Sequence, residues 1–194
     1  MKLHHLFAFS LGIAGIGMAA SLPASAAVSV VGTGLGQACY RTAEFGGNPT
    51  EGIATCTTAL TQEALTISDR ASTFINRGIL RAREGDPEGA IRDYDTGLGI
   101  KADLAEGYVD RGASYLALKH YKEALTDIDK GLSMNVNRPH IAYYDRAIAH
   151  EALGDIRAAY EDYKKAVELA PDFTLAKEQL QRFKVVRKPA ANGT

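Results

Sequence analysis

The 194-residue sequence predicts an all-α protein built of stacked helical hairpins. The triplet Asn76-Arg77-Gly78 returns as Asp110-Arg111-Gly112 and as Asp145-Arg146-Ala147, at steps of 34 and 35 residues. Self-similarity at this period is typical of repeat proteins in which no single unit can bury its apolar face alone. An alanine also follows each triplet at a fixed distance, at Ala90, Ala124 and Ala159.

Each unit divides into two predicted helices. Gly and Ala at fixed offsets let the two helices approach closely, and aromatic residues beside them fill the remaining space. Asp86-Pro87 in the first unit and Gly154-Asp155 in the third restart the chain after a helix, with Asp as N-cap. An aromatic residue stands two positions before each triplet, at Phe74, Tyr108 and Tyr143.

This pattern resembles the tetratricopeptide repeat (TPR) family. The resemblance rests on the aromatic residue, the small residue that ends each triplet, the following alanine, the Tyr or Ile four residues later and the closing Pro171. Three units cover residues 71–104, 105–139 and 140–173. The family's tyrosine at position eleven is present as Tyr115 but replaced by Arg81 and His150 in the other units. The resemblance implies a right-handed superhelix of hairpins with a concave groove.

A degenerate fourth unit is expected within residues 28–70, after a Gly-rich leader. Residues 47–53 align with residues 85–91 at a shift of 38. In this alignment the only two cysteines, Cys39 and Cys56, occupy facing positions of one hairpin. A disulfide between them would contribute roughly 3 kcal/mol by loop entropy. The alternative is a reactive thiol pair or metal site, but no His is near and the spacing is not that of a redox motif.

Residues 1–27 read as a secretory signal peptide. An apolar run from Leu6 to Ala20 precedes small residues at which cleavage would follow Ala26 or Ala27. A membrane anchor is the alternative, but it needs about 20 apolar residues. We therefore expect a periplasmic or secreted protein with no stable membrane insertion after cleavage. Removal of Lys2 changes the formal charge from −1 to −2, which leaves no basic surplus for nucleic acid.

At the other end of the chain, residues 172–186 are expected to form one capping helix. Leu175, Leu180 and Phe183 would cover the end of the stack, since terminal repeats need a polar outer face. Residues 187–194 are expected to be a flexible tail.

A charged pair recurs in step with the repeats. Each triplet arginine is matched by an aspartate on the second helix of the same unit, which predicts structural ion pairs because an unpaired buried charge is costly. The predicted partners are Arg77 with Asp93, Arg111 with Asp127, and Arg146 with Asp162. A row of anion-binding arginines is the alternative, and the matching aspartates count against it.

The family resemblance assigns the concave groove to the first helix of each unit. The candidate partner-binding residues there are Asn76, Ile79, Arg83, Glu106, Val109, Asp110, Leu116, Tyr144, Asp145, Ile148 and Glu151. Some family members clamp a peptide's C-terminal carboxylate, but here only Asn76 matches, and Asp110 and Asp145 carry the opposite charge. An extended or helical partner with apolar anchors and Lys or Arg fits better. The alternative is that these acids are merely solvated.

The sequence holds no pattern that indicates catalysis. His120, His140 and His150 lack metal-ligand spacing, and no nucleophile or phosphate-binding motif precedes a helix. We therefore expect no metal, no cofactor and no enzymatic activity. The predicted function is a non-catalytic protein-interaction module of the cell envelope. The alternative is a structural component that self-associates into a homo-oligomer or scaffolds an envelope complex.

Overall fold

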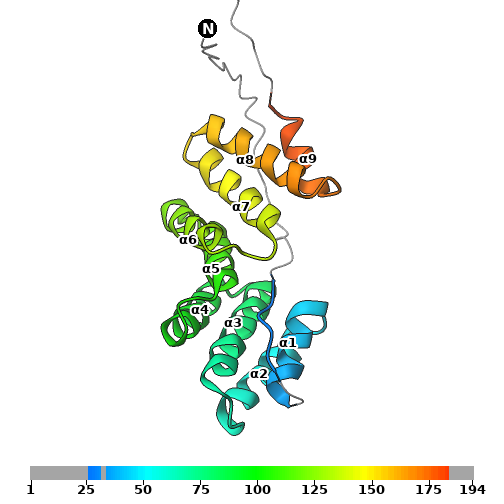
Figure 1. The fold of residues 1–194 in the computed structure, drawn as a ribbon, viewed down its shortest axis with the longest axis vertical. Helices are drawn as coiled ribbons and strands as arrows, with labels where there is room; N and C mark the ends of the chain where they lie inside the picture. Colours follow the sequence, from blue (N-terminus) through cyan, green and yellow to red (C-terminus); the bar gives the residue numbers. More distant parts are fainter. Residues whose placement is uncertain (1–25, 32–33, 184–194) are drawn as a thin grey trace, which may run out of the picture.

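A computed structural model describes residues 26–31 and 34–183. Over these residues it contains nine α-helices and no β-strand, so the predicted all-α class is confirmed there. Figure 1 shows the helices as a curved stack of pairs. They are α1 (Leu35–Phe45), α2 (Pro49–Gln62), α3 (Ile67–Glu84), α4 (Pro87–Ile100), α5 (Ala105–Ala117), α6 (Tyr121–Ser133), α7 (Pro139–Ala152), α8 (Ile156–Leu169) and α9 (Thr174–Leu180).

The consecutive helices α1–α2, α3–α4, α5–α6 and α7–α8 pack as four hairpins. The first helices of the hairpins, α1, α3, α5 and α7, also contact one another along the stack and form its inner layer. The expected degenerate unit is the α1–α2 hairpin. Residues 1–25 of the expected signal peptide and the expected tail at 187–194 lie outside the described residues.

Local sequence explains where the helices begin and end. The Thr66 side chain accepts a hydrogen bond from the Asp69 amide, so α3 begins at Ile67, four residues before the expected start of the first unit. Gly85 ends α3 at a φ of 87°, in the left-handed region that glycine adopts without strain. Asp86 then accepts from the Gly89 amide, and Pro87 opens α4.

The C-terminal helix is shorter than the 172–186 that the sequence predicted. It spans Thr174–Leu180, because Asp172 does not cap it and Phe173 occupies the N-cap position without a side-chain cap. The ring of Phe173 instead packs 5.2 Å from that of Tyr144. Beyond the helix, Phe183 lies 5.8 Å from the ring of Tyr163, and residues 184–186 are outside the described residues.

Three hydrophobic clusters run along the stack and share residues from neighbouring hairpins. Close approach of the helices depends on small residues at fixed positions. At Gly131 a Cβ would lie 3.0 Å from the carbonyl oxygen of Ala105 and 2.5 Å from Val109 Cγ2. Glycine therefore lets α6 pack directly on the backbone of α5.

Candidate functional site

The triplet arginines hold the hairpins together from inside. Arg77 binds Asp93 through two hydrogen bonds of 2.9 and 2.7 Å, from Nε and Nη2. The equivalent distances are 2.7 and 2.8 Å for Arg111 with Asp127, and 2.8 Å for both bonds of Arg146 with Asp162. Such bidentate pairs between a guanidinium and a carboxylate are strong and fix orientation.

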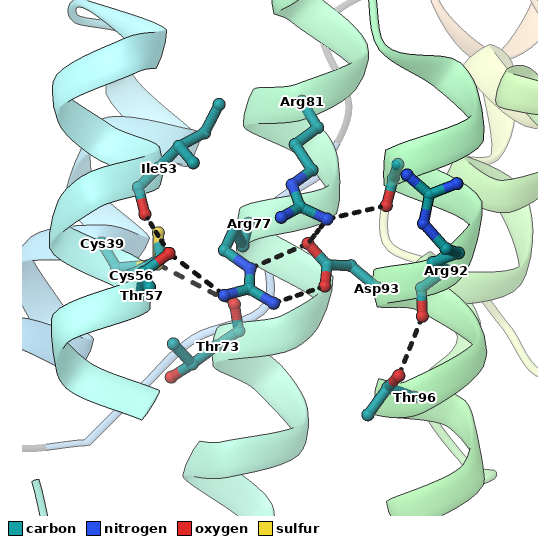
Figure 2. Close-up of polar contacts among 11 residues, drawn as sticks. Cys39, Ile53, Cys56, Thr57, Thr73, Arg77, Arg81, Arg92, Asp93 and Thr96 are labelled. Atoms are coloured by element: carbon teal, nitrogen blue, oxygen red, sulfur yellow. Dashed lines mark hydrogen bonds and ion pairs between the residues drawn. A yellow bond between two sulfur atoms is a disulfide. The ribbon is translucent and has the colours of Figure 1, made fainter. Parts of the chain in front are cut away.

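Each arginine also reaches the preceding unit. Nη1 of Arg111 donates to Asp95 at 2.6 Å, and Nη1 of Arg146 donates to Asp129 at 2.6 Å. Figure 2 shows the first member of the series, where Arg77 lies between α2 and α4 and donates to Thr57 Oγ1 at 3.1 Å. The arginines therefore join successive hairpins as well as the two helices of each.

The aromatic residue before each triplet completes this arrangement. The guanidinium carbons of Arg77, Arg111 and Arg146 lie 5.3, 5.6 and 5.1 Å from the ring centres of Phe74, Tyr108 and Tyr143, respectively. This cation–π contact stabilises the charge at partly buried positions. Hydrogen bonds that Arg111 and Arg146 donate to the carboxylates of Asp127 and Asp162 raise the pKa of both arginines further above its already high value. These residues are occupied by structural contacts.

Two residues that replace the family's tyrosine at position eleven lie close to the aspartates of these pairs. Arg81, at position eleven of the first unit, lies 3.2 Å from Asp93 and adds a second cation to it (Figure 2). His150, at the same position of the third unit, lies 3.9 Å from Asp162. Both substitutions therefore surround the paired carboxylate rather than the groove.

Cys39 and Cys56 form a disulfide that links α1 to α2. Both are fully buried within the first hydrophobic cluster. The bridge staples the N-terminal hairpin, whose glycines and threonines bury little apolar surface.

The inner layer of the first two hairpins is not empty, because residues 26–31 of the chain lie along it. In Figure 1 this segment, drawn in blue, runs beside α3 and α1. The Val28 amide donates to Asn76 Oδ1 at 2.8 Å, and Asn76 Nδ2 donates to the Val28 carbonyl at 2.7 Å. The Ala27 amide donates to Glu44 at 3.1 Å. Asn76, a predicted groove residue, is thus engaged by the chain itself.

A cavity of about 420 Å³ opens next to this segment. Its lining comes from residues 26–29, α1, α3, the start of α5 and the loop before α7. Glu44 of α1 also pairs with Arg138, which precedes α7, and so spans the cavity from one end of the inner layer to the other. Glu106 lines the cavity and accepts from the Asn137 amide at 3.2 Å.

The two acids of the second and third triplets are buried rather than solvated. Asp110 is 4% exposed and Asp145 is 1% exposed. Both carboxylate oxygens of Asp145 lack a hydrogen-bond partner, and burial raises the pKa of this carboxyl to about 8. Beside Asp110 lie Val109 and Ile141, which line a small apolar recess. The inner-layer helices α5 and α7 thus bury two carboxyl groups, one of which lies beside an apolar recess.

The remaining predicted groove residues have mixed surroundings. Ile79 belongs to the first hydrophobic cluster and Leu116 to the second, whereas Arg83 is exposed at the end of α3. Glu151 accepts from Tyr163 at 3.2 Å and pairs with Arg182, which ties α7 to the C-terminal segment. Tyr144 and Ile148 pack within the third cluster.

Three parts of the inner layer could not be predicted from the repeat pattern of the sequence: Glu44, Arg138 and residues 26–31. Each acts across a distance in the chain that no repeat period indicates. The small cleavage-type residues at 24–27 were the single signal near this segment. Over the described ranges no group of three or more His, Cys, Asp or Glu side chains could hold a metal ion. No helix in those ranges has the length and apolar character needed to cross a membrane.

Comparison with known proteins gives a family match for the third unit. Residues 140–173 match the family described as "Tetratricopeptide repeat". Mouse "Tetratricopeptide repeat protein 12" is 37% identical over 87 residues, which are 45% of this chain and 12% of that protein. Rat "Serine/threonine-protein phosphatase 5" is 33% identical over 107 residues, 54% of this chain and 21% of that protein. The chain thus spans only 12% to 21% of the length of these relatives.

Solved structures share the stacked-hairpin fold. The first TPR of Spaghetti (RPAP3), bound to an HSP90 peptide, has a TM-score of 0.56 at 25% identity and covers 59% of this chain and 90% of its own. MamA has a TM-score of 0.62 at 18% identity, with 77% of this chain and 82% of its own covered, and shows the shared fold alone. Residues 140–173 thus match a tetratricopeptide repeat, and the other hairpins share the fold of these structures.

Proposed function

We propose that this chain is a non-catalytic interaction module whose concave groove binds an extended or helical segment of a partner protein, with apolar anchors and a Lys or Arg. The observation that carries the proposal is Asp145, a buried carboxyl with no hydrogen-bond partner on the inner-layer helix α7. A cation from a partner would ionise and satisfy it, since a buried charge is tolerated only when it is paired.

The comparison with RPAP3 supports peptide recognition, because that TPR domain is bound to a peptide. Three of the last four residues of that peptide, SRMEEVD, are acidic. The inner-layer helices described here carry the buried carboxyls Asp110 and Asp145, which offer an acidic ligand no cation to pair with. A basic segment is therefore the partner chemistry that this chain favours.

The proposed setting is the cell envelope, either the periplasm or the secreted space. Support comes from the signal-like residues 1–27 and from the disulfide, which persists in oxidising compartments. Cleavage after Ala26 would leave Ala27 as the amino terminus, and the nitrogen of Ala27 lies 3.1 Å from Glu44. The new ammonium group would pair with that carboxylate. Mass measurement of the exported protein should place its first residue at Ala27, and an N-terminus at Met1 would refute export with cleavage.

Partner capture from an envelope extract tests the binding function. The mature protein is compared with the double variant Asp110→Asn, Asp145→Asn, which keeps the size of both side chains. The matched control, Glu88→Gln with Glu123→Gln, removes two exposed acids from α4 and α6, outside the inner layer. The captured partner should be lost with the groove variant and retained with the control. Equal capture by both variants would contradict the proposal.

A further inference from the structure

The segment of residues 27–31 contacts the groove in the way that a peptide ligand would. Its Val28 peptide group exchanges two hydrogen bonds with Asn76, at 2.8 and 2.7 Å. The Val31 amide donates to Asp69 at 3.1 Å. These hydrogen bonds involve only backbone groups of the extended segment, so any recognition of its side chains must come from other contacts.

The buried side chain of this segment is that of Val30, which is 3% exposed although it lies outside any helix. Its Cγ1 approaches Gly36 so closely that a Cβ at that position would stand only 3.2 Å away. The same hypothetical Cβ would meet Leu65 at 3.1 Å, so Val30 shares this site with the leucine. By contrast, Ser29 and Val31 on either side are exposed. Alternation of one buried side chain between two exposed ones is the pattern of a docked extended peptide.

Chemistry at the first position of the triplets explains why the segment docks here and not further along. Asn76 has an amide, which both donates and accepts and so matches a peptide group. Asp110 and Asp145 occupy the equivalent positions of the next units, and a carboxyl that is ionised by a partner's cation can only accept. The inner layer is therefore divided into a peptide-reading part on α1 and α3 and an acidic part on α5 and α7.

We propose that residues 27–31 are an intramolecular ligand of the α1–α3 part of the groove, and that an extended partner segment reaches Asn76 only by displacing them. A tethered segment has an effective concentration of the order of millimolar, so it competes strongly with a free peptide. This device would restrict a partner to the acidic part until the segment is released. The docking itself does not depend on the proposed function, whereas its role as a competitor does.

The test uses the mature chain and a synthetic, fluorescently labelled peptide with the sequence of residues 27–31. The variant Val30→Asp places a charge in the apolar site and should release the tethered segment. It changes no residue of any helix. The matched control, Ser29→Asp, adds the same charge one residue away at an exposed position. We expect Val30→Asp to bind the peptide at least 10-fold more tightly than wild type or Ser29→Asp. Adding Asn76→Ala to the Val30→Asp chain should abolish that gain.

Hydrogen exchange of the wild-type chain supplies an independent readout that requires no variant to fold. The Val28 and Val31 amides should exchange more slowly than in the free peptide, and Val30→Asp should remove this protection. Exchange of both amides at the free-peptide rate in wild type would overturn the proposal. So would equal peptide affinity of Val30→Asp and wild type, or no detectable binding to Val30→Asp. These failures would leave the Asp110 and Asp145 test unaffected, because that test leaves Asn76 unchanged.

Discussion

Removing Asp127 tests the structural role of the recurring charged pairs. Asp127→Ala deletes two hydrogen bonds to Arg111, of 2.7 and 2.8 Å, at side chains that are 9% and 19% exposed. Breaking a fully buried pair costs about 3–5 kcal/mol, because the remaining charge is left unpaired. Arg111 would retain its contact with Asp95 and with the ring of Tyr108. The expected loss in the free energy of unfolding is therefore about 2–3 kcal/mol.

Chemical denaturation monitored by circular dichroism measures this loss as a lower midpoint. The matched control is Asp95→Ala, which removes the other carboxylate from the same arginine. Because Asp95 is 53% exposed at its side chain, this variant should cost no more than about 1 kcal/mol. The reasoning fails if Asp127→Ala melts like wild type, or if Asp95→Ala is equally destabilising.

The other predictions concern the disulfide, a buried acid and two glycines. Replacing Cys39 and Cys56 by Ala should lower stability by roughly 3 kcal/mol, and an unchanged melting temperature would contradict the proposed staple. The raised pKa of Asp145 destabilises the fold as pH rises, because the unfolded carboxyl ionises near pH 4 and the folded one near pH 8. Asp145→Asn should therefore gain stability relative to wild type between about pH 4 and pH 8 and level off above, whereas a pH-independent difference would refute the desolvated carboxyl. Gly131→Ala should cost about 1–3 kcal/mol of stability, because its Cβ would clash with α5. Gly99→Ala, with open space around the added Cβ, should stabilise the fold by about 0.5–1 kcal/mol. Thermal melts in which both variants change stability with the same sign would refute the close approach of α6 to α5.

The sequence was most informative where a feature repeats. A period of 34 or 35 residues implies identical packing in every unit, so the hairpins and the pairing of Arg77 with Asp93 could be predicted from the pattern alone. The disulfide was predictable because a shift of 38 residues placed Cys39 opposite Cys56 in the same frame. Equivalent residues of successive repeats have the same surroundings, so a contact made in one unit is expected in the others.

Features that occur once were not predictable in this way. Residues 26–31 carry no periodic pattern, and their principal partner, Asn76, lies 48 residues from Val28. The pair between Glu44 and Arg138 spans 94 residues and depends on the curvature of the whole stack. The length of the last helix was overestimated because the ring of Phe173 packs against Tyr144 instead of leaving Asp172 to cap the helix. Burial of Asp145 likewise depends on tertiary packing that charge patterning does not encode.

The footprint of a captured partner on the protein tests the central claim most directly. Hydrogen exchange with mass spectrometry, with and without that partner, reports which helices become protected. Binding in the concave groove predicts protection on α3, α5 and α7, which belong to the inner layer. Protection confined to α4, α6 and α8, with the inner helices unchanged, would contradict it.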